Sequence, residues 1–141
     1  MVLIIVLSLA LGTAMIKTRA AELIANGFIT LFLPLGRVGV LFGIYLITTI
    51  LAAYITNKAS VGIIFPIALT IASNLNLSPA PFILTVAYAS AANFMTPHGY
   101  QTNLMVYGPG NYLFKDFFKI GAPLTVLYMI TTVTILSLLY L

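Results

Sequence analysis

The sequence contains no cysteine, and only two of its 141 residues, Glu22 and Asp116, are acidic. The absence of cysteine excludes disulfide bonds and thiolate metal sites within the chain. The two acids are far apart in sequence and no enzyme nucleophile is apparent, so no catalytic residue is predicted. The six Lys and Arg residues are too few and too scattered to form a nucleic-acid-binding surface.

Charge is scarce and apolar side chains dominate. Hydrophobic residues make up 62% of the chain and charged residues 6%, with a mean hydropathy of +1.15. Soluble domains carry about a quarter charged residues, so this composition indicates an integral membrane protein. The length leaves room for about four or five passes of roughly 20 residues each. That is few for a complete transporter.

The start of the chain is apolar, and its first positive charges, Lys17 and Arg19, come only after the apolar run. A secretory signal has its basic residues first, so a cleavable signal is a poor interpretation. We expect instead a membrane helix entered partway, and therefore a fragment or one half of a longer protein.

Long apolar runs predict an all-α membrane protein. The expected membrane segments are residues 1–16, 19–36, 38–57, 59–75, 82–95 and 121–141. Pro66 removes a helical hydrogen bond, which predicts a kink or a break in the fourth segment. Residues 114–120 alternate aromatic and charged side chains, as an interfacial helix does.

The distribution of positive charge predicts an orientation. Lys17, Arg19, Lys115 and Lys119 are expected on one side of the membrane, and Arg37 on the other. The positive-inside rule places the four together in the cytoplasm, with Arg37 and the C-terminus outside. We therefore expect a multi-pass protein of the cell membrane, in a bacterium the inner membrane.

A polar stretch at residues 93–112 interrupts a region that has no charged residue from Ala59 to Phe114. It could be an extramembrane loop, but residues 82–95 give only about 21 Å of helix, short of the roughly 30 Å of hydrocarbon. A helix that resumes at the apolar residues 104–107 would complete the crossing. Irregular backbone at membrane depth must be surrounded by protein or by a water-filled cavity. The stretch therefore predicts a broken transmembrane helix and is the primary candidate site.

A second polar group, Thr56, Asn57 and Lys58, allows two interpretations. It is either an ordinary cytoplasmic turn between two complete spans or the tip of a re-entrant hairpin near the midplane. Short, proline-interrupted segments mark binding sites in secondary transporters, which favours the hairpin. The following half-helix would then direct N–H groups at an anion, and Lys58 would be an intramembrane charge.

Thr-Asn pairs recur beside helix breakers, at residues 56–57 and 102–103. If the two breaks face each other across a shared cavity, their oxygen atoms suit a hard cation such as Na⁺ and their N–H groups an oxyanion. His98 has no second histidine or carboxylate near it, so a zinc site is improbable and His98 is interpreted as a packing residue.

These segments together resemble a known family. ITNKASVGIIFPIAL (residues 55–69) and SAANFMTPHGYQTNLMVYGPGNYLFKDFFKIGAPL (residues 90–124) are similar to the C-terminal half of the divalent-anion/sodium symporters, with weaker support from residues 10–25. These symporters belong to the ion transporter superfamily that includes citrate and arsenite permeases. The likeness covers nearly the whole chain.

The resemblance implies a fold and a set of ligand contacts. The chain would be a single transmembrane domain, residues 1–141, forming one half of an inverted-repeat transporter, with the N-terminal repeat missing. The implied substrate contacts are Thr56, Asn57, Lys58, Tyr100, Gln101 and Thr102, and the implied cation contacts are Asn57, Gly99 and Asn103. Lys58 stands where the family has a small polar residue at the tip of its hairpin. A fixed ammonium there could replace part of a sodium ion's role.

The function predicted from these residues is cation-coupled symport of a small divalent anion, sulfate or a di- or tricarboxylate. The implied partners are the anion, Na⁺ or H⁺, membrane lipid, and the missing half or a partner chain, with a homodimer in the intact protein. No cofactor is expected beyond Na⁺ as coupling ion. Two alternatives stay open: half of a cation/proton antiporter or arsenite-type permease, and a structural membrane subunit.

Overall fold

The computed structural model describes residues 2–141, and within them it is helical with no strand. The α-helices are α1 (Val2–Lys17), α2 (Ala20–Phe32), α3 (Gly36–Tyr54), α4 (Asn57–Asn74), α5 (Ala80–Ala91), α6 (Gln101–Tyr107) and α7 (Phe114–Tyr140), with 3₁₀ turns η1 (Leu33–Leu35) and η2 (Pro97–Gly99). The prediction of an all-α chain is confirmed. Each predicted membrane segment contributes a helix.

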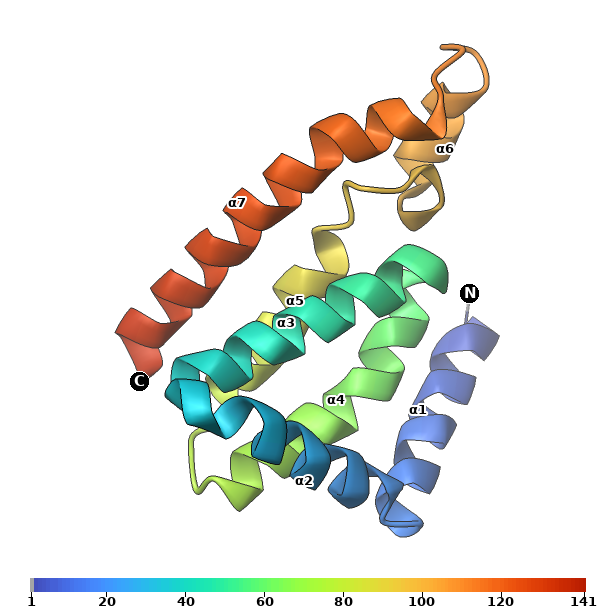
Figure 1. The fold of residues 1–141 in the computed structure, drawn as a ribbon. Helices are drawn as coiled ribbons and strands as arrows, with labels where there is room; N and C mark the ends of the chain where they lie inside the picture. Colours follow the sequence, from blue (N-terminus) through green and yellow to red (C-terminus); the bar gives the residue numbers. More distant parts are fainter. Residues whose placement is uncertain (1) are drawn as a thin grey trace.

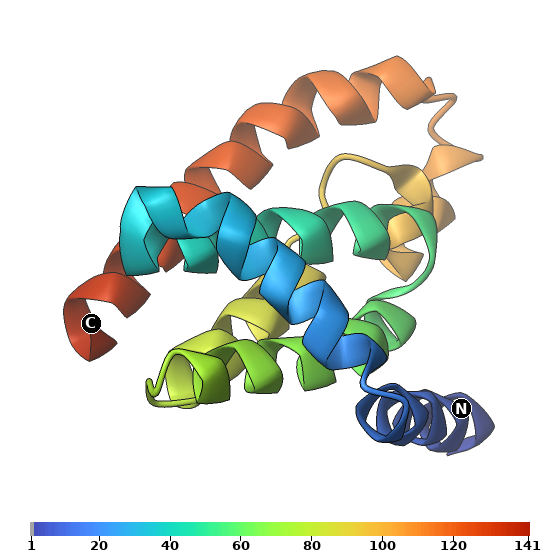
Figure 2. The ribbon, with the colours of Figure 1, turned by 60° about the horizontal axis from the view of Figure 1, so that its bottom comes forward.

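The helices surround a core built on α3, α4 and α5. The α3–α4 hairpin and α5 pack against one another, α1 and α2 cover α4, and α7 lies along α3 and α5 (Figure 1). Figure 2 shows α1 at the edge of the bundle. The largest side chains with almost no exposure include Tyr45, Leu41 and Ile44 of α3, Ile71 of α4 and Phe82 of α5. α3 is therefore the central helix.

The outer surface is apolar rather than polar. Leu3, Leu23 and Leu138, on three different helices, are 70%, 75% and 80% exposed. Two helical stretches, Ala20–Tyr54 and Phe114–Tyr140, are long and apolar enough to cross a membrane, while Val2–Lys17 and Ala80–Ala91 are shorter apolar helices. An apolar surface spread over several helices is expected to face lipid or another part of a protein.

The threonine hydroxyls buried in α3 and α5 are satisfied within their own helices. Thr48 and Thr49 of α3 donate to the carbonyl oxygens of Ile44 and Tyr45 at 2.6 and 2.9 Å, and Thr85 of α5 donates to that of Pro81 at 2.7 Å. A bond back to the preceding turn removes the cost of burying a hydroxyl. These threonines are compatible with an apolar core.

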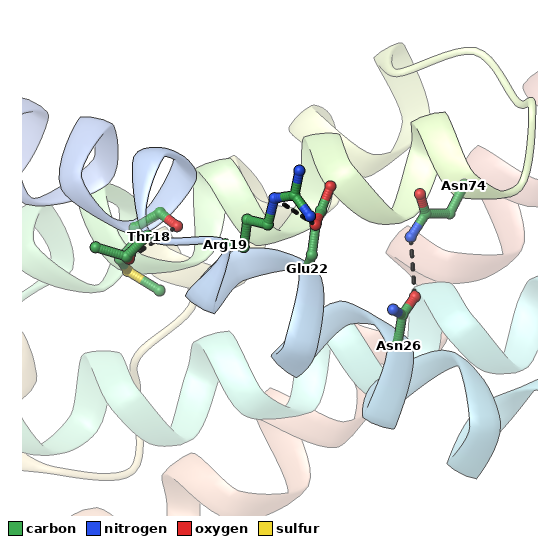
Figure 3. A network of polar contacts seen from close by, with 6 residues as sticks. Thr18, Arg19, Glu22, Asn26 and Asn74 are labelled. Atoms are coloured by element: carbon green, nitrogen blue, oxygen red, sulfur yellow. Dashed lines mark hydrogen bonds and ion pairs between the residues drawn. The ribbon is translucent and has the colours of Figure 1, made fainter.

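Polar contacts hold α2 in place at one edge of the bundle (Figure 3). Arg19 adopts the left-handed conformation, φ 57°, between α1 and α2, and its Nε lies 4.0 Å from Oε2 of Glu22. Both side chains are well exposed, so this ion pair adds little stability. The amide of Asn74, at the end of α4, donates to Oδ1 of Asn26 in α2 at 3.1 Å (Figure 3).

Pro66 does not interrupt its helix. α4 is continuous from Asn57 to Asn74, so of the kink or break predicted at Pro66 the structure excludes the break. The proline deprives the Gly62 carbonyl of its helical partner. At this position α1 approaches closely: a Cβ on Gly12 would lie 3.3 Å from the Gly62 oxygen and 3.4 Å from Cγ of Pro66. Two glycines thus let α1 pack over the irregular turn.

The last two predicted segments are also one element. Residues 114–120, expected as a separate interfacial helix, are continuous with the final span, because α7 runs unbroken through Pro123 for 27 residues, about 40 Å. Gly121 lies where α7 crosses the chain after α5: a Cβ there would clash with the Phe94 backbone. The missing side chain sets the distance between α7 and the bundle.

We predict that Gly121→Ala lowers the stability of the protein by about 1–3 kcal/mol, because the added methyl meets backbone that cannot rotate away. Gly27→Ala is the matched control. Gly27 lies inside α2 with nothing within 4 Å of its Cβ position, so alanine should stabilise the helix by about 0.5–1 kcal/mol. Melting temperatures in detergent measure both, and a Gly121→Ala protein as stable as the wild type would contradict the close crossing.

Candidate functional site

The α3–α4 turn is built around a helix cap. Thr56 is extended, φ −155° and ψ 155°, and its Oγ1 accepts a hydrogen bond from the Ala59 N–H at 3.2 Å. Threonine is favoured at this position because it satisfies a backbone donor that the helix leaves unpaired. Thr56, predicted as a substrate contact, therefore caps α4. In the sequence, the signal for this cap is a threonine directly before a helical run.

Asn57 and Lys58 open the first turn of α4 and line a cavity of about 350 Å³. The cavity is shared with Ser8 of α1, Gly62 of α4 and Ser90 of α5. Oδ1 of Asn57 is buried and has no hydrogen-bond partner among residues 2–141. An unpaired buried acceptor costs about 1–3 kcal/mol, so such an atom needs an explanation. A cation or a hydrogen-bond donor would supply the missing partner.

The second break separates α5 from α6. α5 ends at Ala91, an irregular segment leads into η2, Tyr100 is extended at φ −135°, and α6 begins at Gln101. The helix thus stops and resumes, as predicted for residues 93–112. Asn103 Nδ2 reaches back from α6 and donates to the Thr96 carbonyl oxygen at 3.3 Å. An asparagine side chain therefore pairs one of the backbone groups that the break leaves free.

A single threonine joins the two breaks. Thr96 Oγ1 lies 3.4 Å from the carbonyl oxygen of Ala53, which belongs to the last turn of α3. Carbonyls of a last helical turn have no intrahelical partner, so the hydroxyl fills a vacant position. The turn at residues 55–56 and the break at residues 92–100 are consequently neighbours in the fold.

The predicted ligand residues divide between different surroundings. Tyr100, Gln101 and Thr102 are exposed at the start of α6, whereas Gly99 lies against the side chain of Asn93. Asn103 lines a second, mostly apolar cavity of about 680 Å³ between α6, the following loop and α7. The polar groups of the two breaks thus line two cavities, with Asn57 and Lys58 on one and Asn103 on the other.

Three further polar residues belong to this region and were not among the predicted ligand residues, although one of them, Asn93, lies within the predicted stretch 93–112. Ser8 and Ser90 line the cavity beside Asn57, and their hydroxyls donate to carbonyls of their own helices, Ile4 and Ala87. Asn93 is 1% exposed within the second break. Its polarity at the end of an apolar run was visible in the sequence, but its burial depends on contacts with distant segments.

Glu22 lies outside both breaks, whereas Asp116 lines the cavity of about 680 Å³ together with Asn103. Asp116 Oδ2 accepts from the Leu113 N–H at 2.8 Å and so caps α7, and Glu22 pairs with Arg19 at the surface. Residues 2–141 contain no cluster of three or more His, Cys, Asp or Glu side chains suited to a metal. The chemistry available at the breaks is therefore that of amides, hydroxyls, backbone groups, the Lys58 ammonium, the exposed His98 imidazole and, in the cavity beside Asn103, the Asp116 carboxylate.

Comparison with known proteins gives one family. The whole chain, residues 1–141, matches the family described as Citrate transporter. An uncharacterized transporter of Synechocystis sp. is 41% identical over 92% of this chain and 21% of that protein. Sodium/sulfate cotransporter 1 of Chlamydomonas reinhardtii is 35% identical over 91% of this chain and 15% of that protein. An uncharacterized transporter of Escherichia coli, YfbS, is 33% identical over 99% of this chain and 23% of that protein.

The chain therefore spans about a fifth of the length of the first curated relatives that it matches. No solved structure matches it.

We predict that Thr56→Val destabilises α4 by about 1 kcal/mol, because valine keeps the shape of threonine and removes the oxygen that accepts from Ala59. Thr56→Ser keeps the oxygen and should melt within a degree or two of the wild type. A melting temperature for Thr56→Val equal to that of Thr56→Ser would show that the cap does not contribute to stability.

Proposed function

Because the chain belongs to the citrate transporter family, we propose that it forms the C-terminal repeat of a secondary carrier for a small divalent anion, sulfate or a di- or tricarboxylate. The chain is part of a membrane transport protein and not an enzyme. Relatives in Chlamydomonas reinhardtii bear the name sodium/sulfate cotransporter, which supports sulfate as substrate and Na⁺ as coupling ion.

One observation carries the proposal: Asn57 presents a buried, unpaired amide oxygen beside Lys58 in a cavity between three helices. Neutral oxygen atoms suit a hard cation such as Na⁺, and an ammonium suits an anion. Cation and anion would then bind side by side at the start of α4. The attraction between the two bound ions would couple their binding.

The second break supplies the remaining contacts in this proposal. Gly99 and Asn103 would contribute to the cation site, and Tyr100, Gln101 and Thr102 to the substrate site. The last three are exposed within residues 2–141 and would be covered by the other repeat of the longer protein. In that protein the α3–α4 hairpin would be re-entrant, the second repeat inverted, and two copies would form a homodimer in the bacterial inner membrane.

The alternatives are less well supported. A proton-coupled antiporter or arsenite-type permease usually needs an acidic residue within the membrane. Here Asp116 caps α7 and Glu22 is exposed beside Arg19. A purely structural subunit would use its polar residues to join helices, and would not need an unpaired amide oxygen at a cavity.

Transport by the complete protein tests the proposal. In proteoliposomes we expect counterflow of labelled sulfate or succinate that is faster with an inward Na⁺ gradient than with K⁺. Anion uptake driven by a proton gradient alone would make H⁺ the coupling ion in place of Na⁺, whereas proton-driven cation exchange without anion uptake would favour the antiporter class. If no divalent anion is transported under Na⁺ or proton gradients, the carrier function fails.

We predict that Lys58→Ala weakens anion binding about tenfold, because it removes a charge-assisted contact, with little change in melting temperature. Lys119→Ala, on the exposed side of α7, is the control for the loss of one positive charge. Isothermal titration with sulfate and succinate measures both. An unchanged dissociation constant for Lys58→Ala would make residues 56–58 an ordinary turn.

A further inference from the structure

Asn93 is an amide buried at the point where the fifth helix has just ended. It is 1% exposed and follows Ala92, the residue that terminates α5. A polar side chain with this little exposure must have its hydrogen bonds made within the protein or by a bound molecule. The contacts of its two polar atoms therefore show what it can bind.

The oxygen atom of Asn93 faces a hydroxyl, whereas its nitrogen faces no acceptor. Thr96 Oγ1 lies 3.5 Å from Asn93 Oδ1, in the same cluster that reaches the Ala53 carbonyl. Asn93 Nδ2 has no hydrogen-bond partner among residues 2–141, although it carries two N–H groups. The unpaired chemistry of this side chain is therefore that of a donor.

Gly99 shows where the free nitrogen lies. A Cβ placed on Gly99 would clash with Nδ2 and Cγ of Asn93, so the amide packs directly against the glycine backbone. Gly99 ends η2, and Tyr100 follows it in extended conformation before α6. The two N–H donors are thus held inside the break between α5 and α6, in space that only glycine leaves open.

We propose that Asn93 contacts the transported anion, donating a hydrogen bond from Nδ2 to one of its oxyanion oxygens when the site is loaded. This inference rests on the function proposed above and adds a residue to it. Donors suit sulfate or carboxylate oxygen atoms, and a bound cation would instead need the amide oxygen that faces Thr96. The unpaired nitrogen has a cost in the empty state, and the bound anion removes it.

The test uses the complete transporter in detergent, with sulfate and succinate as probes. Asn93→Asp replaces the donor with a carboxylate of the same shape and should weaken both anions at least about tenfold, from a lost donor plus repulsion. Asn93→Ala removes the whole amide, including the oxygen that faces Thr96, but adds no charge, and should weaken them less. The Na⁺ concentration that gives half-saturation, measured at saturating anion, should stay near the wild-type value for both variants.

Asn76→Asp is the matched control, because Asn76 is an exposed turn residue between α4 and α5. Anion affinities for Asn93→Asp and Asn93→Ala within about twofold of those of the wild type and Asn76→Asp would overturn the inference. A loss of Na⁺ affinity with unchanged anion affinity would also overturn it, by making Asn93 a cation ligand.

Stability is controlled separately. Should Asn93→Asp fail to fold, Asn93→Ser keeps a donor on a smaller side chain, and it is expected to bind the anions more tightly than Asn93→Ala. Equal affinities for the serine and alanine variants would overturn the inference. If the wild-type protein binds neither anion, the proposed function fails first, and the role of Asn93 fails with it.

Discussion

Backbone N–H and carbonyl groups cannot be left without partners in an apolar environment, and this strongly apolar chain interrupts its helices at residues 55–56 and 92–100. The interruptions persist because nearby side chains replace the lost helical bonds. Thr96 reaches the carbonyl of Ala53, Asn103 reaches that of Thr96, and Thr56 accepts from Ala59. Thr96 also holds the two breaks next to each other, so a contact that pairs the backbone also positions the candidate site.

Small residues determine how closely the helices approach. Gly12 and Gly62 bring α1 onto α4 at the turn that Pro66 disrupts, and Gly121 brings α7 onto the chain after α5. The close approach of α1 also brings Ser8 to the cavity beside Asn57. Because these glycines have no side chain, the helices pack closely enough to accommodate the proline, and α1 forms one wall of the candidate site.

Much of the fold could be predicted from local patterns. Long apolar runs predicted the helices, and the polar residues of 93–112 predicted the break between α5 and α6. The continuity of α4 through Pro66 and of α7 from Phe114 could not be predicted, because both depend on packing between segments distant in sequence. For the same reason Asn57 and Lys58 could be chosen as candidates by composition, whereas the burial of Asn93 could not be foreseen.

The shortness of α6 has a thermodynamic consequence. A helix of seven residues is too short to be stable in isolation, so its order depends on tertiary contacts such as the Asn103 bond and the ring contact between Tyr107 and Phe117. Regions held by few contacts open locally before the rest of a protein does. The backbone amides of α6 would therefore exchange hydrogen with solvent sooner than those of α3, and occupancy of the neighbouring break would slow that exchange.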